Sequence, residues 1–210
     1  MIDKVKCLIT QMLLMPAPME YLRYEKILRR AIEEECGYRF KSNFEAAMST
    51  ALYILNIPYA YEPLKLLFTA GNKVITYTPD FVLGMQHENS KILIETHGSA
   101  FIDKEFLRKM DAFMSSSESD SYYTILVTDR RPKKPNKLKI ALNKYGYSWG
   151  DICDEVWYIP YALELNMPFT TRTGKGTIFS MLRDLKENKN VSIINEKQVT
   201  RKSITQKSMY

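Results

Sequence analysis

The sequence predicts an α/β protein of the α+β kind, in which helices flank a mixed β-sheet. Two helical patterns come first, a group of short strand patterns follows, and helices and strands then alternate. At 210 residues with 45% hydrophobic residues, the chain is long enough to bury one core. We therefore expect a single domain over residues 1–196, without internal repeats.

Two helices are expected near the N-terminus. Pro18 is a residue type that begins helices, and a helix is predicted over 19–35, with Gly37 just past its end. A second helix is predicted over 43–56, because Pro58 cannot continue it. Apolar residues recur at helical spacing on one face of each helix. They are Tyr21, Tyr24, Ile27, Leu28 and Ile32, then Phe44, Ala47, Met48, Ala51, Leu52 and Leu55.

The middle of the chain is rich in β-branched and aromatic residues and predicts a run of strands. The segment 70–72 contains Gly71 and indicates a turn. The polar segment 87–90 indicates a second turn, between the last two strands. We expect the strands to join one sheet. They are predicted at 59–62, 64–69, 73–78, 81–85 and 91–95.

Helices and strands alternate in the second half. The first helix is expected over 103–114, with Phe106, Met110 and Phe113 facing inward. After a serine-rich loop, an apolar strand is expected over 122–128. Residues 197–210 have almost no apolar side chains, so we expect a mobile basic tail. A helix at 136–145, a strand at 156–159 and a helix at 177–188 complete the prediction.

Composition restricts the partners and the compartment. The 30 Lys and Arg residues exceed the 24 Asp and Glu residues, which favours an acidic partner such as nucleic acid, although a generic basic surface has the same charge. Cys7, Cys36 and Cys153 have no C-x-x-C spacing, which argues against a disulfide framework or a zinc site and fits a reducing, intracellular compartment. The apolar segment 7–15 is short and interrupted, so neither a signal peptide nor a membrane partner is expected.

Two acids on neighbouring predicted strands are the first candidates for chemistry. Asp80 follows Pro79, and Glu95 ends the next strand. Mg²⁺ prefers oxygen ligands and is usually bound by one or two carboxylates plus water and substrate phosphate. Alternatively, Asp80 only opens a turn and Glu95 lies at an exposed strand end. However, Glu95 follows the apolar run 92–94, and a buried carboxylate is costly unless it is paired or metal-bound. The pair therefore indicates metal-assisted phosphodiester hydrolysis.

Two further residues are candidates for the same site. Glu45 lies in the first turn of the second helix and could face the same cleft, but Ser42 and Glu45 also match the capping box S-x-x-E. His97 follows Glu95 by two residues, so alternation along a strand places both on one face. Histidine can donate a hydrogen bond, act as a base or ligate a softer metal such as Mn²⁺. The alternative is a histidine that bonds to the backbone at a strand end.

This array resembles the PD-(D/E)XK nuclease superfamily. The resemblance covers Glu45, Pro79-Asp80 and Glu95-Thr96-His97-Gly98, followed by a helix, and spans residues 42–128. More finely, the chain resembles the nuclease-like proteins of archaeal spindle-shaped viruses, and the superfamily includes Holliday junction resolvases. The resemblance implies a restriction-endonuclease-like core and a homodimer. A relative of the viral proteins would act in the host cytoplasm.

The resemblance also implies roles for individual residues. Asp80 and Glu95 match the metal-binding acids, and Glu45 matches the acid that many members carry on a helix. The implied cofactor is Mg²⁺ or Mn²⁺. His97 stands where the motif has a lysine, which puts catalytic competence in doubt. A lysine can be supplied from elsewhere, and Lys104 on the following helix is the nearest candidate, although a solvated helix lysine is the favoured explanation.

Two basic segments are candidate DNA contacts. The segment 129–139 contains six cations and one acid, and it follows a strand on the expected active-site edge. Such residues bind phosphates with salt-sensitive, sequence-independent affinity. The segment 170–177 could bind phosphate at a helix N-terminus, but it lacks the Walker A pattern, because Phe169 replaces the first glycine. The residues are Arg130, Arg131, Lys133, Lys134, Lys137 and Lys139, then Arg172 and Lys175.

The sequence therefore predicts a metal-dependent DNA endonuclease, and structure-specific or resolvase-like cleavage is one form that its activity could take. His97 in the lysine position favours a second hypothesis, a DNA-binding protein that keeps the fold and has lost turnover. A third is a protein-interaction module with an accidental acid pair. Salt-dependent DNA affinity distinguishes the third from the other two.

Overall fold

A computed structural model describes residues 7, 18–70, 72–130, 135–160, 178–188 and 191–193. Its helices are α2 (Pro18–Cys36), α3 (Asn43–Ile54), α4 (Lys104–Met114), α5 (Lys137–Tyr145) and α6 (Ile178–Glu187), with short 3₁₀ turns at Ser99–Phe101 and Ser119–Ser121. Its strands are β1 (Tyr59–Tyr61), β2 (Leu66–Ala70), β3 (Lys73–Tyr77), β4 (Phe81–His87), β5 (Ser90–Thr96), β6 (Tyr122–Arg130), β7 (Glu155–Pro160) and β8 (Val191–Ile193).

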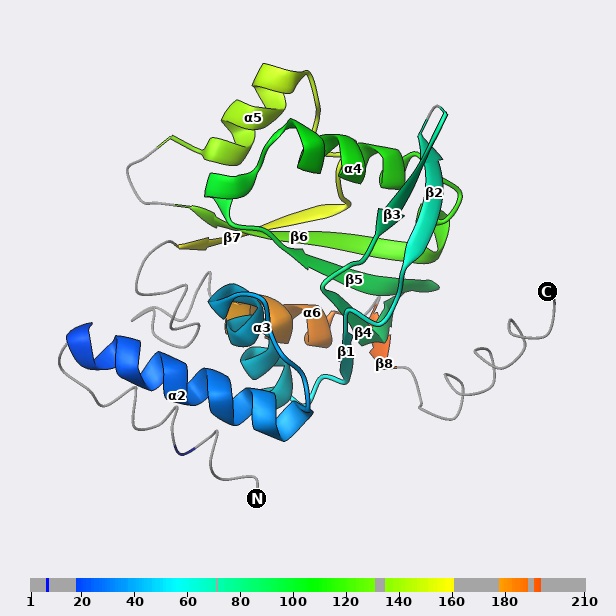
Figure 1. The fold of residues 1–210 in the computed structure, drawn as a ribbon. Helices are drawn as coiled ribbons and strands as arrows, with labels where there is room; N and C mark the ends of the chain where they lie inside the picture. The colour runs from blue at the N-terminus through cyan, green and yellow to red at the C-terminus, as the bar shows by residue number, and fades with distance from the viewer. Residues whose placement is uncertain are drawn as a thin grey trace.

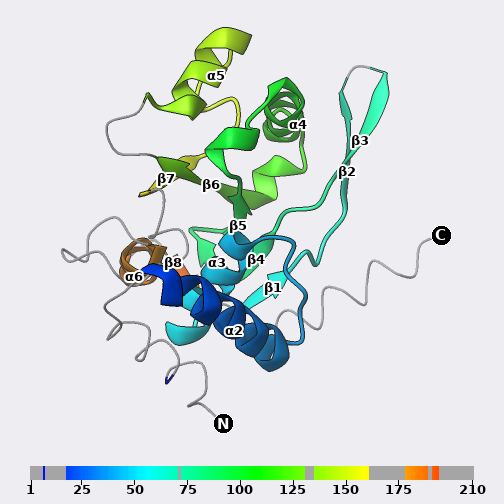
Figure 2. The same ribbon diagram turned by 60° about the vertical axis from the view of Figure 1, so that its left-hand side comes forward.

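The architecture is a mixed sheet between two helical layers, which confirms the predicted fold class. Figure 1 shows α2, α3 and α6 on one side of the sheet and α4 and α5 on the other, and Figure 2 shows the same arrangement from another side. Every helix and strand predicted within the described ranges is present, with ends shifted by at most two residues. In these ranges, no helix combines the length and the apolar composition needed to cross a membrane.

The strand order places β5 near the middle of the sheet. The order is β1-β4-β5-β6-β7, and β8 also pairs with β4. β4 is antiparallel to β1, β5 and β8, whereas β5, β6 and β7 are parallel. Because parallel strands end at the same edge, the C-terminal ends of β5, β6 and β7 lie together at one edge of the sheet.

Two parts of the sheet prediction need correction. β2 and β3 were expected in the main sheet, but they pair only with each other and project as a hairpin (Figure 2). The inner face of this hairpin, with Phe68 and Tyr77, packs in the core beneath α4, while Leu67 and Val74 on the outer face are exposed. The short strand β8 was not predicted, because three residues carry too little pattern.

A close approach at Gly84 brings the start of β1 to β4. The Gly84 N–H donates a 2.6 Å hydrogen bond to the Pro58 carbonyl. A Cβ atom at Gly84 would lie 2.6 Å from the Pro58 Cβ atom, so any larger residue would push the two segments apart. The pairing of β4 with β5 shifts register between Val82 and Gln86, and Gly84 lies within this interval.

The sheet separates two hydrophobic cores, and β5 contributes to both. Ile92 and Ile94 face the core under α2, α3 and α6, whereas Leu93 faces the core under α4 and α5. On α4, the residues predicted to face inward, Phe106, Met110 and Phe113, are buried in that second core. The predicted burial of Glu95, which continues this apolar run, is confirmed at 5% exposure.

Candidate active site

Asp80 is held at the end of β5 by the residue next to Glu95. The Thr96 N–H and the Thr96 hydroxyl both donate to Asp80 Oδ2, at 2.7 and 2.6 Å. On its other side, the Asp80 carbonyl accepts a hydrogen bond from the Glu62 N–H at 2.9 Å. The start of β4 is therefore joined to the end of β5, and the structure brings together the two segments that carry the predicted acids.

The environment of Asp80 disfavours its negative charge. Burial raises the pKa of Asp80 well above its ordinary value, and the negative charge of Glu95 raises this pKa further. The two hydrogen bonds from Thr96 act in the opposite direction, and Glu45 adds a smaller increase. In the described part of the chain, Asp80 Oδ1 accepts no hydrogen bond. The site therefore favours a proton or a cation beside Asp80.

Glu95 lies between a tyrosine hydroxyl and a lysine. Its Oε2 accepts a 3.0 Å hydrogen bond from the hydroxyl of Tyr77, which is fully buried. Its Oε1 lies 3.6 Å from the Lys109 ammonium, a separation longer than a hydrogen bond. The same ammonium lies 4.9 Å from the centre of the Tyr77 ring, in a cation–π contact. Oε1 therefore has an electrostatic partner but no hydrogen bond to the described residues.

Lys109 is a further candidate for the site, and it was not predicted from the sequence. The prediction named Lys104, which is exposed in the first turn of α4, whereas the structure brings Lys109 to Glu95. Five residues along a helix turn the side chain to a different face. A signal was present: Lys109 falls within the apolar stripe of Phe106, Met110 and Phe113, and a lysine on a buried stripe requires an acidic partner.

Glu45 is engaged at the N-terminus of α3. Its Oε2 accepts from the Lys41 N–H at 2.9 Å and from the Tyr61 hydroxyl, and its Oε1 accepts from the Ser42 hydroxyl at 2.8 Å. Ser42 Oγ in turn accepts from the Glu45 N–H at 3.1 Å. These bonds match the capping box considered above, except that Glu45 accepts from the N–H of Lys41 instead of the N–H of the cap residue Ser42. Metal binding by Glu45 stays a prediction.

His97 lies just past β5 and contacts neighbouring loop and helix residues. Its Nε2 is 3.0 Å from the Phe101 carbonyl oxygen, and because a carbonyl only accepts, Nε2 carries the hydrogen. The imidazole stacks on the Phe106 ring, with centres 3.9 Å apart and planes 9° apart. This is the backbone-bonded arrangement considered as the alternative. A catalytic role for His97 stays a prediction.

The structure describes only part of the predicted DNA surface. Lys137 and Lys139 are exposed in the first turn of α5. Arg130 is the last residue of β6, on the edge where β5 ends, but its side chain is outside the described part. The other named cations and the predicted tail also lie outside it: Arg131, Lys133, Lys134, Arg172, Lys175 and residues 197–210.

The donor atoms fit a site with two protein carboxylates. Among the described residues, no group of three or more His, Cys, Asp or Glu side chains is placed to hold a metal ion. Mg²⁺ commonly takes one or two carboxylates and completes its shell with water and phosphate. Asp80 and Glu95 each offer one oxygen without a hydrogen bond, and such an acid pair suits that arrangement.

Comparison with known proteins adds no further assignment. No protein-family model, no curated protein and no solved structure was found to match the chain.

Proposed function

We propose that this protein is a metal-dependent DNA nuclease of the PD-(D/E)XK type. The observation that carries the proposal is the position of Asp80, which Thr96, the residue after Glu95, holds at the end of β5. Burial and the charge of Glu95 raise the pKa of Asp80, so two acids are kept together at a free-energy cost. Such a costly arrangement is typical of functional sites.

Asp80 and Glu95 are proposed to hold Mg²⁺ or Mn²⁺. A divalent cation would offset the repulsion between the two carboxylates, which otherwise favours protonation of Asp80. When bound, the metal would polarise the scissile phosphate and lower the pKa of a bound water. Glu45 is not needed for this role, since its two oxygens already accept hydrogen bonds from Lys41, Ser42 and Tyr61.

Lys109 is proposed to take the role of the motif lysine. Its ammonium lies beside Glu95, and its side chain keeps 31% of its exposure, so it can also face solvent and substrate. A cation at this point stabilises the negative charge that develops on the phosphate. Tyr77 orients Glu95 through its hydroxyl. His97, which bonds to the Phe101 carbonyl, positions the loop after β5.

The basic segment between β6 and α5 is proposed to bind the DNA backbone. Arg130 begins it at the edge of the sheet that holds Glu95, and Lys137 and Lys139 are exposed at its other end. Lysine and arginine neutralise phosphates, so the affinity should fall as salt rises. A two-fold homodimer is the assembly that the resolvase-like resemblance favours, and closed two-fold symmetry is the commonest assembly of soluble proteins.

Cleavage of labelled duplex, single-stranded and four-way-junction DNA tests the proposal. The reactions contain Mg²⁺, Mn²⁺ or EDTA, and they compare the wild type with Asp80→Asn and with Asp120→Asn, an exposed acid near the start of β5, at the opposite end of the strand from Glu95. We expect metal-dependent cutting that Asp80→Asn lowers about a thousandfold and Asp120→Asn leaves unchanged. Equal cutting by Asp80→Asn, or cutting in EDTA, would remove the proposal.

A DNA-binding protein without turnover is the second candidate. One observation favours it: Glu95 already has two protein partners, Tyr77 and Lys109, and so can be stabilised in the absence of metal. Salt-sensitive DNA binding with no cutting under any metal would support this candidate over the nuclease. In that case, His97→Lys is the first substitution to examine for gained activity.

A further inference from the structure

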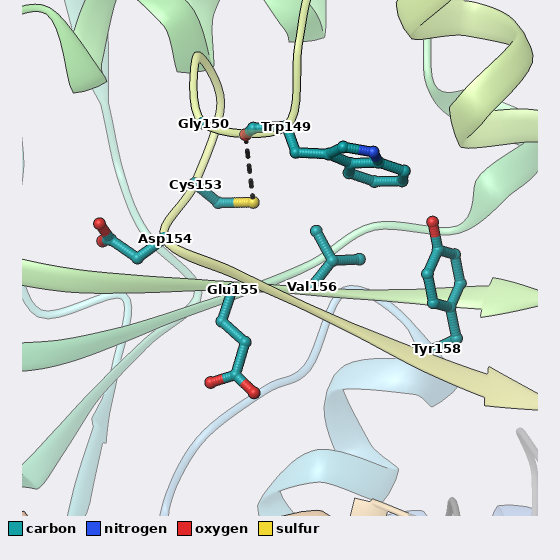
Figure 3. A pocket seen from close by; sticks show the side chains of 7 residues that line it. All are labelled: Trp149, Gly150, Cys153, Asp154, Glu155, Val156 and Tyr158. Carbon is teal, nitrogen blue, oxygen red and sulfur yellow. Dashed lines mark hydrogen bonds between the residues drawn. The ribbon is translucent and has the colours of Figure 1, made fainter.

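We infer that the hollow beside Trp149 and Tyr158 is a stacking subsite for an unpaired base of a single-stranded nucleic acid (Figure 3). The inference deepens the proposed function, because it names single-stranded nucleic acid as the substrate class or product that contacts this surface. It rests on the proposal that the protein acts on nucleic acid.

Two aromatic side chains form one end of this hollow. Trp149 lies in the loop before β7, and Val156 and Tyr158 lie on β7 itself (Figure 3). The two aromatic rings are 6.1 Å apart and nearly perpendicular, at 87°. Trp149 keeps 38% of its exposure, whereas Trp157, the other tryptophan, keeps 5%. An exposed indole with a second ring beside it offers a face on which a base can stack.

Both ends of the basic segment meet at Tyr158. Tyr158 pairs with Thr128 on β6, and Arg130 follows two residues later, paired with Pro160. At the other end of the segment, the Asn136 side chain donates a 2.9 Å hydrogen bond to the Tyr158 hydroxyl. The same Asn136 caps α5, where Lys137 and Lys139 are exposed. An aromatic platform beside backbone-binding cations is the usual combination in single-strand binding proteins.

The acids that line the hollow do not oppose this use. Asp154 Oδ2 accepts a 2.7 Å hydrogen bond from the Thr124 N–H, and Glu155 accepts one from the Tyr123 hydroxyl at 3.2 Å. Figure 3 shows both carboxylates pointing away from the two rings. Burial raises the pKa of the Cys153 thiol to about 12, so this group is neutral at physiological pH. The aromatic end of the hollow is therefore free of negative charge from these three residues.

The hollow lies within reach of the proposed cleavage site. Glu95 pairs with Leu126, and Tyr158 pairs with Thr128, two residues further along β6. Alternation therefore places Glu95 and Tyr158 on the same face of the sheet. Two strand spacings separate β5 from β7, which is about 10 Å. This backbone separation is one that a few nucleotides can span.

Binding of labelled oligonucleotides in EDTA tests the inference without requiring cleavage. The probes are a thymidine 20-mer, a uridine 20-mer and a DNA duplex. We expect Trp149→Ala to weaken thymidine 20-mer binding about tenfold and to change duplex binding little. Trp149→Phe should retain binding, because the phenyl ring still stacks. Ile140→Ala is the matched control, since Ile140 is an exposed apolar residue on the adjacent α5. The uridine probe tells whether DNA or RNA is preferred.

Intrinsic fluorescence gives a readout that does not depend on the folding of a variant. The thymidine 20-mer should quench wild-type tryptophan emission, since Trp149 is the exposed tryptophan. Unchanged affinity in Trp149→Ala, a preference for duplex, or unchanged tryptophan emission with the thymidine 20-mer would overturn the inference. If Trp149-dependent binding persists without any cleavage, the nuclease proposal fails and this inference stands. If cleavage is intact and Trp149→Ala binds normally, this inference alone fails.

Discussion

Glu45 and Glu95 are both buried carboxylates that accept a hydrogen bond from a tyrosine, yet their surroundings differ. At Glu45, both oxygens accept hydrogen bonds, from Lys41, Ser42 and Tyr61, all close to one helix end or to β1. At Glu95, one oxygen accepts a hydrogen bond, and the other faces Lys109 at 3.6 Å. The hydrogen bonding of the buried carboxylate is therefore complete at Glu45, where nearby groups supply the donors, and incomplete at Glu95.

This difference separates a structural acid from a candidate functional acid. A buried carboxylate whose hydrogen bonds are complete stabilises the fold, because its desolvation is compensated. Glu95 lies instead close to Asp80, and its negative charge helps to raise the pKa of Asp80. A divalent cation beside Asp80 would offset that effect. Burial alone would not have distinguished the two acids, since both are nearly inaccessible.

Among the two side chains that contact Glu95, Lys109 should have the larger effect on cleavage when it is replaced. In the proposed nuclease, Lys109→Met should lower the cleavage rate about 10- to 100-fold, because one charge that stabilises the transition state is lost. Lys104→Met is the matched control on the same helix and should cut normally, since Lys104 is exposed in the first turn. Initial rates with Mg²⁺ measure both. Equal losses in the two variants would contradict the assignment.

Glu45→Gln should destabilise the protein by about 1–3 kcal/mol, because the amide nitrogen cannot accept a hydrogen bond. Either Ser42 or the pair of Lys41 and Tyr61 then loses its acceptor. Urea unfolding measures the change in the free energy of unfolding. Glu187→Gln, at the exposed end of α6, provides the control and should change stability little. A loss of cleavage in Glu45→Gln without a loss of stability would instead assign Glu45 to the metal site.

Asp80→Asn should stabilise the metal-free protein at neutral pH. The pKa of Asp80 is raised above its ordinary value of 3.8, so its contribution to stability is full below that value and is lost as the pH rises through the folded-state pKa. Asparagine carries no charge, and its oxygen can still accept from the Thr96 N–H. Thermal unfolding between pH 4 and pH 8 should show a gain in Tm for the variant that shrinks toward pH 4.

Metal addition sharpens the same measurement. Mg²⁺ should raise the Tm of the wild type at pH 7, because a ligand that binds only the folded state stabilises it. The rise should be absent in Asp80→Asn and retained in Asp120→Asn. A lower Tm in Asp80→Asn that does not change with pH would mean that Asp80 is a structural turn residue whose charge is compensated. The contrast with Glu45 would then disappear.

His97→Ala should have the smallest effect. The substitution removes the stacked contact with Phe106 and the hydrogen bond to the Phe101 carbonyl, at a cost of about 1 kcal/mol in stability. Cleavage should fall less than in Lys109→Met, because His97 is proposed to position the loop. A larger loss of activity than in Lys109→Met, at unchanged stability, would make His97 the catalytic residue.

Prediction from sequence succeeded where a local pattern decides the structure. The helices over α3 and α4 follow from apolar stripes and from caps at Ser42 and Asp103, which act within one helical turn. The pairing of β4 with β5 follows from two strands joined by a short turn at Glu88 and Asn89, so antiparallel contact requires little chain ordering.

The same reasoning failed where distant segments compete for one surface. The hairpin of β2 and β3 has an ordinary strand pattern, but it forms a separate two-stranded sheet. In the main sheet, β1 pairs directly with β4. No local rule identifies which neighbour a strand chooses, since the choice depends on packing against α4. Likewise, proximity in sequence pointed to Lys104, whereas the structure places Lys109 beside Glu95.

The amino-acid sequence alone therefore determined the fold class and the meeting of Asp80 with the end of β5. Periodicity and short turns act over a few residues and can be read directly from the chain. Tertiary structure decided which carboxylate oxygens remain open, which lysine faces Glu95, and that Tyr158 meets both ends of the basic segment. These outcomes depend on contacts between elements far apart in the chain, whose geometry is set only when the two cores pack.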